Sequence, residues 1–144
     1  MSTLEQLLLK SKDTSSKVNQ SLSGIKTGKE TKDLMIAAFL SLSMQHHSSI
    51  VLLVEEKLTS SASALARPLL ESSYRAKWLS LVATNEEVEL INTQSDKDPW
   101  KPTWKLAKEI DIFLTTNNPS IPIDAFHKIY QYNSPSLHGF THGG

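Results

Sequence analysis

The sequence predicts an all-α protein, a single bundle of about six to seven helices. Glycine is scarce, since only five of the 144 residues are glycine and two of those are the last two. Apolar residues recur at spacings of three and four through most of the chain, which is the period of an amphipathic helix. No stretch alternates apolar and polar residues as a half-buried strand would. These observations favour helices throughout and exclude a sheet-based fold.

The first two predicted helices cover residues 2–25 and 31–58. The first is poor in apolar residues, with a serine-rich middle, and glycines punctuate its end. The second carries two neighbouring apolar stripes, and two buried flanks imply packing partners on two sides. We expect one stripe to comprise Ile36, Leu40, Met44, His47, Val51, Val54 and Leu58, and the other Met35, Phe39, Leu42, His46, Ile50 and Leu53.

Cap residues and prolines divide the rest of the chain. We expect a cap-rich break at residues 59–61, helices over residues 62–83, 84–92, 103–116 and 122–133, a loop over 93–102, and a last helix that starts at Ser134-Pro135. Pro68 predicts a kink, because its ring frees the carbonyl of Ala64 one turn back. Inward positions are expected at Leu70, Tyr74, Trp78, Val82, Trp104, Ala107, Ile110, Leu114, Ile123, Phe126 and Ile129 or Tyr130. The last helix has barely begun when the sequence stops, so we expect a truncated final helix and a chain shortened from a longer bundle.

Composition fits one globular domain over residues 1–144, with 1–28 as a helix that can lie at its periphery. The formal net charge is zero, so any contact with RNA must come from a local patch. There are no cysteines, which excludes a disulfide scaffold and fits a cytoplasmic protein. The start of the chain lacks the features of a signal peptide, and its apolar runs are short, so we expect no membrane partner.

Both arginines of the chain lie in one predicted helix, and every other positive charge is a lysine. Arg67, Glu71 and Arg75 follow at steps of four, which puts them along one helix face. One interpretation is a solvated charge ladder. The other is a cleft in which Glu71 orients the guanidinium groups toward a phosphate or a partner carboxylate. We expect Glu71 to bond one arginine and Arg67 to point inward, in which case loss of Glu71 costs about 3 kcal/mol or more.

The histidines and two tryptophans are further candidates. His46 and His47 fall on the apolar stripes, where a histidine is most often a satisfied core residue, although one of them, with His47 as the candidate, could also share a pocket with Arg67 and Glu71. His138 and His142 are four residues apart, which suits a metal pair, an acid–base or phosphate-contacting role, or a packing role; no third ligand is apparent, and we expect no metal and no cofactor. Trp100 and Trp104 could stack on bases, but Trp104 is better explained as core.

Several segments resemble an uncharacterised family of bacterial all-helical proteins, from about residue 31 to the end. They are an Arg-Pro-Leu-x-Glu helix, Ala64-Leu65-Ala66-Arg67-Pro68-Leu69-Leu70-Glu71, and a late His-Gly-Gly element, Leu137-His138-Gly139-Phe140-Thr141-His142-Gly143-Gly144. The layout is more remotely similar to the HEPN superfamily, which comprises compact, often dimeric up-and-down helical bundles, many of them ribonucleases of bacterial defence and toxin systems. HEPN enzymes carry an arginine followed four to six residues later by histidine, and neither Arg67 nor Arg75 is followed in this way.

Two functions follow from these observations. The resemblance implies a HEPN-like bundle that binds or cleaves RNA as a component of a defence or toxin-type system. Its catalytic candidates are Arg67, Glu71, Arg75, His47, His138 and His142. The alternative is a non-catalytic helical module that dimerises. In either case we expect a homo-oligomer, because a truncated last helix leaves Leu137 and Phe140 without cover.

Overall fold

The computed structural model describes residues 2–24, 26, 28–94 and 96–139, the last six of these by their backbone alone. This part of the chain forms an all-α helical bundle, as predicted, and contains no strand. The seven helices are α1 (Thr3–Leu22), α2 (Thr31–Glu55), α3 (Thr59–Ala64), α4 (Ala66–Leu81), α5 (Asn85–Thr93), α6 (Thr103–Asn117) and α7 (Ala125–Gly139).

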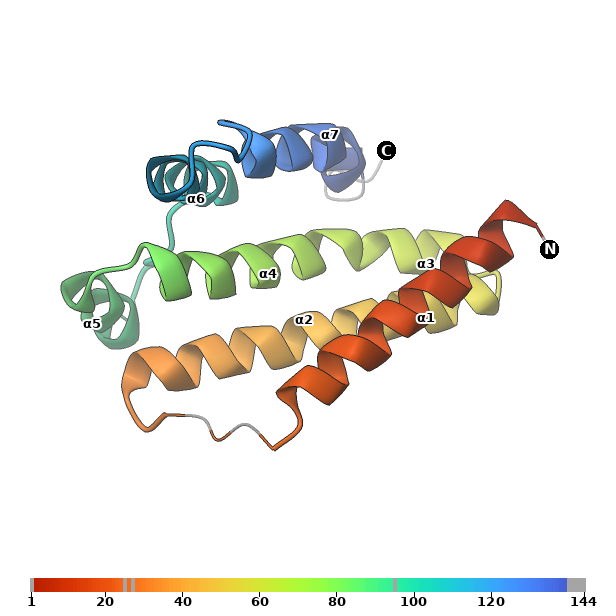
Figure 1. The fold of residues 1–144 in the computed structure, drawn as a ribbon, viewed down its shortest axis with the longest axis horizontal. Coiled ribbons are helices and arrows are strands. Elements are labelled where there is room, and N and C mark those ends of the chain that lie inside the picture. Colours follow the sequence, from red (N-terminus) through yellow and green to blue (C-terminus); the bar gives the residue numbers. More distant parts are fainter. Residues whose placement is uncertain (1, 25, 27, 95, 140–144) are drawn as a thin grey trace.

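Helices α2 and α4 form the antiparallel centre of the bundle (Figure 1). Small residues allow them to approach closely: Ser43, Ser72 and Ala76 are all buried at their contact, and the Ser43 hydroxyl donates to the Ser72 hydroxyl at 2.9 Å. Helix α1 packs on the outer side of α2 and has no buried residue. Helices α6 and α7 pack on the other side of α4, and α5 lies at the end where α2 begins.

The hydrophobic core lies toward the α5 end of the bundle. Trp78 and Leu79 of α4 are almost completely buried there, together with Leu106 and Ile110 of α6 and Val88 of α5. Partly buried side chains surround this centre, namely Met35, Ile36, Phe39, Val82, Ile91, Trp100, Leu114 and Phe126. The prediction that Trp78 is buried is therefore confirmed. The core around it joins α4 to α2, α5 and α6.

Local sequence explains the starts of two helices and the break before α4. Helices α1 and α5 begin with capping boxes, Ser2 with Glu5 and Thr84 with Glu87, in which hydroxyl and carboxylate satisfy backbone N–H groups that no helical carbonyl reaches. The predicted kink near Pro68 is a break, because Leu65 separates α3 from α4 one turn before the proline.

The prediction of two separate helices over 122–133 and from 134 onward is wrong. Helix α7 runs without interruption from Ala125 to Gly139 through Pro135. A proline removes one backbone donor and bends a helix, but the surrounding hydrogen bonds can carry the helix past it.

Several expected core positions are exposed. Trp104 is 43% exposed and Ile123 is 73% exposed, and on α2 Leu40 and Leu42 are also exposed. Leu58 lies beyond the end of α2 and is exposed as well, while Val51 is buried and Met44 is half-buried. The helices that pack on α2 cover only part of its surface. Some apolar residues of both predicted stripes are therefore exposed.

Helix α2 is long and apolar enough to cross a membrane, by length and composition alone. Only 6% of this apolar stretch is buried inside the bundle, although α2 packs along α4 as its central pair.

Candidate ligand-binding pocket

A cavity of about 280 Å³ brings the two arginines together with the loop that precedes α6. Its walls come from α4, from the residues around Trp100, and from Tyr130 of α7. The lining residues are Arg67, Leu70, Glu71, Arg75, Asp98, Trp100, Lys101, Pro102, Thr103 and Tyr130. We call this cavity the arginine pocket.

The first arginine forms the predicted pair with Glu71 but does not point into the core. Arg67 Nε donates to Glu71 Oε1 at 2.9 Å, and the Arg67 side chain is 46% exposed. The expectation that Arg67 is inward is therefore wrong, and the large cost expected for loss of Glu71 no longer follows. The reason is helical geometry: a step of eight residues turns about 80° around the axis, so Arg67 and Arg75 do not share one strict face.

Arg75 is the half-buried arginine, and aromatic rings hold it. Its guanidinium carbon lies 4.8 Å from the ring centroid of Trp100 and 5.8 Å from that of Phe39. Within the described residues no hydrogen bond or ion pair engages this guanidinium, so its five N–H groups remain for water or a ligand. A planar cation held on aromatic faces with unused donors is suited to bind a phosphate or a carboxylate.

The ring of Trp100 is fixed from several sides. It makes edge contacts with Phe39, at 5.3 Å between centroids, and with Trp78, at 6.2 Å. Its backbone N–H donates to Asp98 Oδ1 at 3.1 Å, which closes a turn before the ring. The residue after Trp100 is Lys101, whose side chain forms several hydrogen bonds with the protein.

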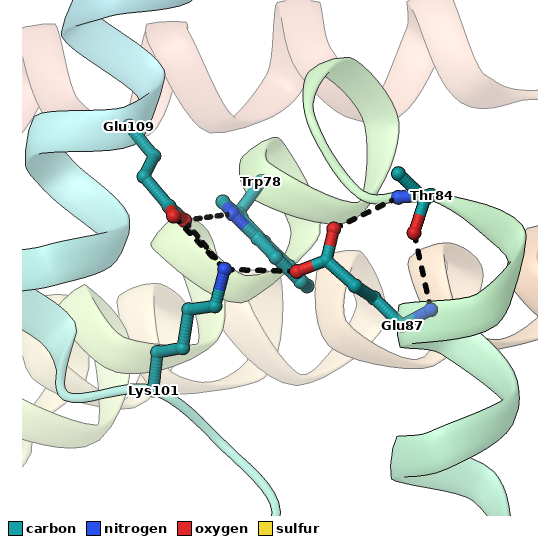
Figure 2. Close-up of polar contacts among 5 residues, drawn as sticks. All are labelled: Trp78, Thr84, Glu87, Lys101 and Glu109. Atoms are coloured by element: carbon teal, nitrogen blue, oxygen red, sulfur yellow. Dashed lines mark hydrogen bonds and ion pairs between the residues drawn. The ribbon is translucent and has the colours of Figure 1, made fainter.

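Figure 2 shows Lys101 reaching between two carboxylates that belong to different helices. Its ammonium donates to Glu87 Oε2 at 2.8 Å and to both oxygens of Glu109, at 2.9 and 3.1 Å. Glu109 also accepts the Trp78 indole N–H at 2.7 Å, and Glu87 accepts the backbone N–H of Thr84 in the capping box. We call Trp78, Glu87, Lys101 and Glu109 the Lys101 network.

In the Lys101 network, hydrogen bonds between opposite charges shift the pKa values of Glu87 and Lys101 toward their charged forms. Burial alone would raise the pKa of Glu87, but the hydrogen bonds from Lys101 and Thr84 outweigh it and hold that pKa below its usual value. Burial alone would lower the pKa of Lys101, but its bonds to Glu87 and Glu109 outweigh it and raise that pKa. Lys101 is therefore charged at neutral pH and is already neutralised by its partners.

Helix α7, which brings Tyr130 to the pocket, is held by two buried polar groups. Asp111 of α6 accepts the N–H groups of Phe126 and His127 at 2.8 and 2.9 Å, and so caps the start of α7 from a neighbouring helix. The Tyr74 hydroxyl donates to the Phe126 carbonyl at 2.8 Å. Burial, and then the charge of Asp111, raise the pKa of Tyr74 to about 12.

The histidine candidates do not join the described part of the pocket. His47 lies on the opposite side of the bundle, where Ser11 and Ser15 of α1 hydrogen-bond its two ring nitrogens at 2.8 and 2.7 Å. The expectation that His47 shares a pocket with the arginines is therefore wrong. His138 lies within α7, but its side chain is outside the described residues, and His142 is outside them altogether. Among the described side chains no group of three or more possible ligands could hold a metal ion.

The arginine pocket has cationic side chains that can bind an anion. No histidine is among its described lining residues, so they supply few groups for acid–base chemistry. Of its cations, Lys101 is paired with Glu87 and Glu109 and Arg67 is paired with Glu71, whereas Arg75 has no acceptor among the described residues. Its carboxylates are Glu71, which is bonded to Arg67, and Asp98 at the loop. The other lining residues come from the 98–103 loop and from α7. In this loop the sequence had indicated Trp100, as a residue that could stack on bases.

Residues 40–144 match the model of a family described as a family of unknown function (DUF6988). The chain belongs to this family. The family match begins inside α2 and therefore includes every residue of the arginine pocket and the Lys101 network, whereas α1 lies outside it. No curated protein and no solved structure matches the chain.

Proposed function

We propose that this DUF6988 protein is a cytoplasmic, HEPN-like RNA-binding protein of a bacterial defence or toxin-type system, and that it contacts RNA through the arginine pocket. The observation that carries the proposal is Arg75, which lies on the ring of Trp100 with no acceptor among the described residues. Guanidinium donors beside an aromatic ring suit a phosphodiester and its neighbouring base. Since the net charge of the chain is zero, such a local patch is what RNA binding would require.

Binding of a labelled single-stranded RNA of mixed sequence, followed by fluorescence anisotropy, tests this proposal. Arg75→Gln and Arg67→Gln should each weaken binding, and each lost phosphate contact should lower the slope of log affinity against log salt concentration by about 0.7. Lys108→Gln is the matched control, because Lys108 also lies over a tryptophan, Trp104, but outside the pocket. Equal affinity for the three variants and the wild type would refute the proposal.

Cleavage of RNA is a separate step of the same proposal. It would need a proton-transfer group near the arginines, and His138 is the candidate on α7. Incubation of a labelled RNA with wild type and His138→Ala, in the presence of a chelator, tests it. Cleavage by the wild type that the variant loses would support a ribonuclease, and intact RNA with both proteins would leave a binding protein.

A second candidate function is a dimerising helical module, which exposed apolar side chains favour. The largest group of leucines with more than half of their surface exposed lies in the first two helices and the turn after them, namely Leu4, Leu7, Leu9, Leu34, Leu52 and Leu58. A second copy of the chain that packed on these helices would remove such side chains from water. Sedimentation should give a homodimer at high micromolar concentration, and Leu7→Glu with Leu52→Glu should convert it to a monomer. A monomeric wild type would contradict this candidate.

The side chains of Leu137 and Phe140, which the sequence suggested for the same role, lie outside the described residues.

A further inference from the structure

Lys101 lines the arginine pocket, yet its charge is directed to protein groups. All three of its hydrogen bonds go to the carboxylates of Glu87 and Glu109, and its ammonium also lies 5.0 Å from the ring centroid of Trp78. An ammonium has three donors, and here carboxylate oxygens accept from it at three places. Lys101 therefore has little capacity left to bind an anion in the pocket.

The partners of Lys101 are held firmly in their own helices. Glu87 is the third residue of α5 and is fixed by the capping box with Thr84. Glu109 lies in the middle of α6 and accepts from the buried indole of Trp78. The loop before α6 is thus attached through one side chain to α5 and α6, and Glu109 joins this attachment to Trp78 of α4, as Figure 2 shows.

The attachment acts directly on the wall of the pocket, because Trp100 precedes Lys101 in the chain. The ring of Trp100 is the closer of the two aromatic rings over which Arg75 lies. Without the hydrogen bonds of Lys101, the loop would be less firmly held. The ring of Trp100 could then move away from the guanidinium of Arg75. A site whose contacts depend on supporting residues loses affinity when that support is removed.

We infer that Lys101 is a positioning residue of the arginine pocket, which fixes Trp100 under Arg75 for binding of the RNA phosphate backbone and does not itself contact the phosphate. The inference that the geometry serves RNA rests on the proposed function, whereas the coupling of Lys101 to Arg75 rests on contacts within the protein.

The coupling can be measured without a ligand, because the chain has only two arginines. Phenylglyoxal modifies exposed guanidinium groups, and mass spectrometry of the digested protein reports the rate at each arginine. In Lys101→Met the rate at Arg75 should rise several-fold, while Arg67, which is bonded to Glu71, serves as an internal reference. Lys108→Met is the control for loss of a surface lysine and should change neither rate. An unchanged ratio of the Arg75 and Arg67 rates in folded Lys101→Met would overturn the inference. If Lys101→Met fails to fold, Glu87→Gln removes one of the two anchors and makes the same comparison.

RNA binding supplies the second part of the test. Lys101→Met should weaken binding by about 5- to 10-fold, the loss expected when a cation–π contact is disturbed, and should leave the salt slope of the wild type unchanged. A slope lowered by about 0.7 would make Lys101 a phosphate contact and overturn its assignment as a positioning residue. If wild-type binding does not depend on the arginines, the proposed function fails, and the labelling rates still decide whether Lys101 positions Arg75.

Discussion

Replacing Asp111 by asparagine tests how helix α7 is held in place. Asp111 is 3% exposed, and its two oxygens each accept one backbone N–H, from Phe126 and from His127. Asparagine has nearly the same shape, but one oxygen becomes an NH₂ group. That group would face a backbone N–H, so two donors would meet and one buried N–H would lose its acceptor.

The magnitude follows from these two hydrogen bonds. A hydrogen bond to a charged group contributes about 1.5–3 kcal/mol, and a buried donor left without a partner costs about 1–3 kcal/mol. Since one of the two acceptors survives, although without its full charge, we expect Asp111→Asn to lower the free energy of unfolding by about 3 kcal/mol. For a chain of this length that corresponds to a fall in Tm of roughly 10 °C.

Urea unfolding followed by circular dichroism measures this difference. The control is Asp124→Asn, because Asp124 lies just before α7, its side chain is 41% exposed, and it pairs with the exposed Lys128. The control should lie within about 1 kcal/mol of the wild type. If Asp111→Asn and Asp124→Asn unfold alike, the cap from α6 does not hold α7, and the placement of Tyr130 at the arginine pocket loses its explanation.

Three further predictions follow from the contacts described above. Glu71→Gln should change the free energy of unfolding by less than about 1 kcal/mol, because its pair with Arg67 is exposed; a loss of 3 kcal/mol in a urea titration would show a desolvated pair. Trp78→Ala should cost about 3–5 kcal/mol in the same titration, since the indole is 1% exposed, and a change under 1 kcal/mol would contradict its place in the core. The pKa of Glu87 is lowered on folding and that of Lys101 is raised, so the stability that Lys101→Met removes should be fully present between the ordinary pKa values of the two groups. It should shrink at acid pH as Glu87 protonates and at strongly alkaline pH as Lys101 loses its proton, and a difference that grows toward acid pH would refute the assignment.

The sequence was sufficient for the helices because their periodicity is a local property. The step of three and four along α2 and the cap residues of α5 predicted those helices to within a few residues. The continuous helix α7 was missed because a Ser-Pro pair usually marks a helix start, and only the full set of surrounding hydrogen bonds decides whether the helix continues.

The candidate site was predicted in part, since the arginine segment does line a pocket. The sequence pointed to Arg67 as the inward residue, whereas Arg75 is the one that rings surround, because the loop that carries Trp100 folds back over the later turn of α4. A loop has no period, so the sequence favoured Trp104, which lies on a helical period, as the core tryptophan, whereas Trp100 is the one that packs against the core. For Asp111 a signal was available: it lies next to Ile110 on the inward side of α6, where a carboxylate needs buried donors.

The most direct test of the central claim is an arginine footprint of the protein with and without RNA. Phenylglyoxal labelling of the wild type should report both guanidinium groups, and a saturating amount of single-stranded RNA should slow labelling of Arg75 and of Arg67. Protection of both arginines is the result that RNA binding in the arginine pocket predicts. RNA that binds and leaves both arginines fully reactive, or RNA that does not bind at all, would contradict it.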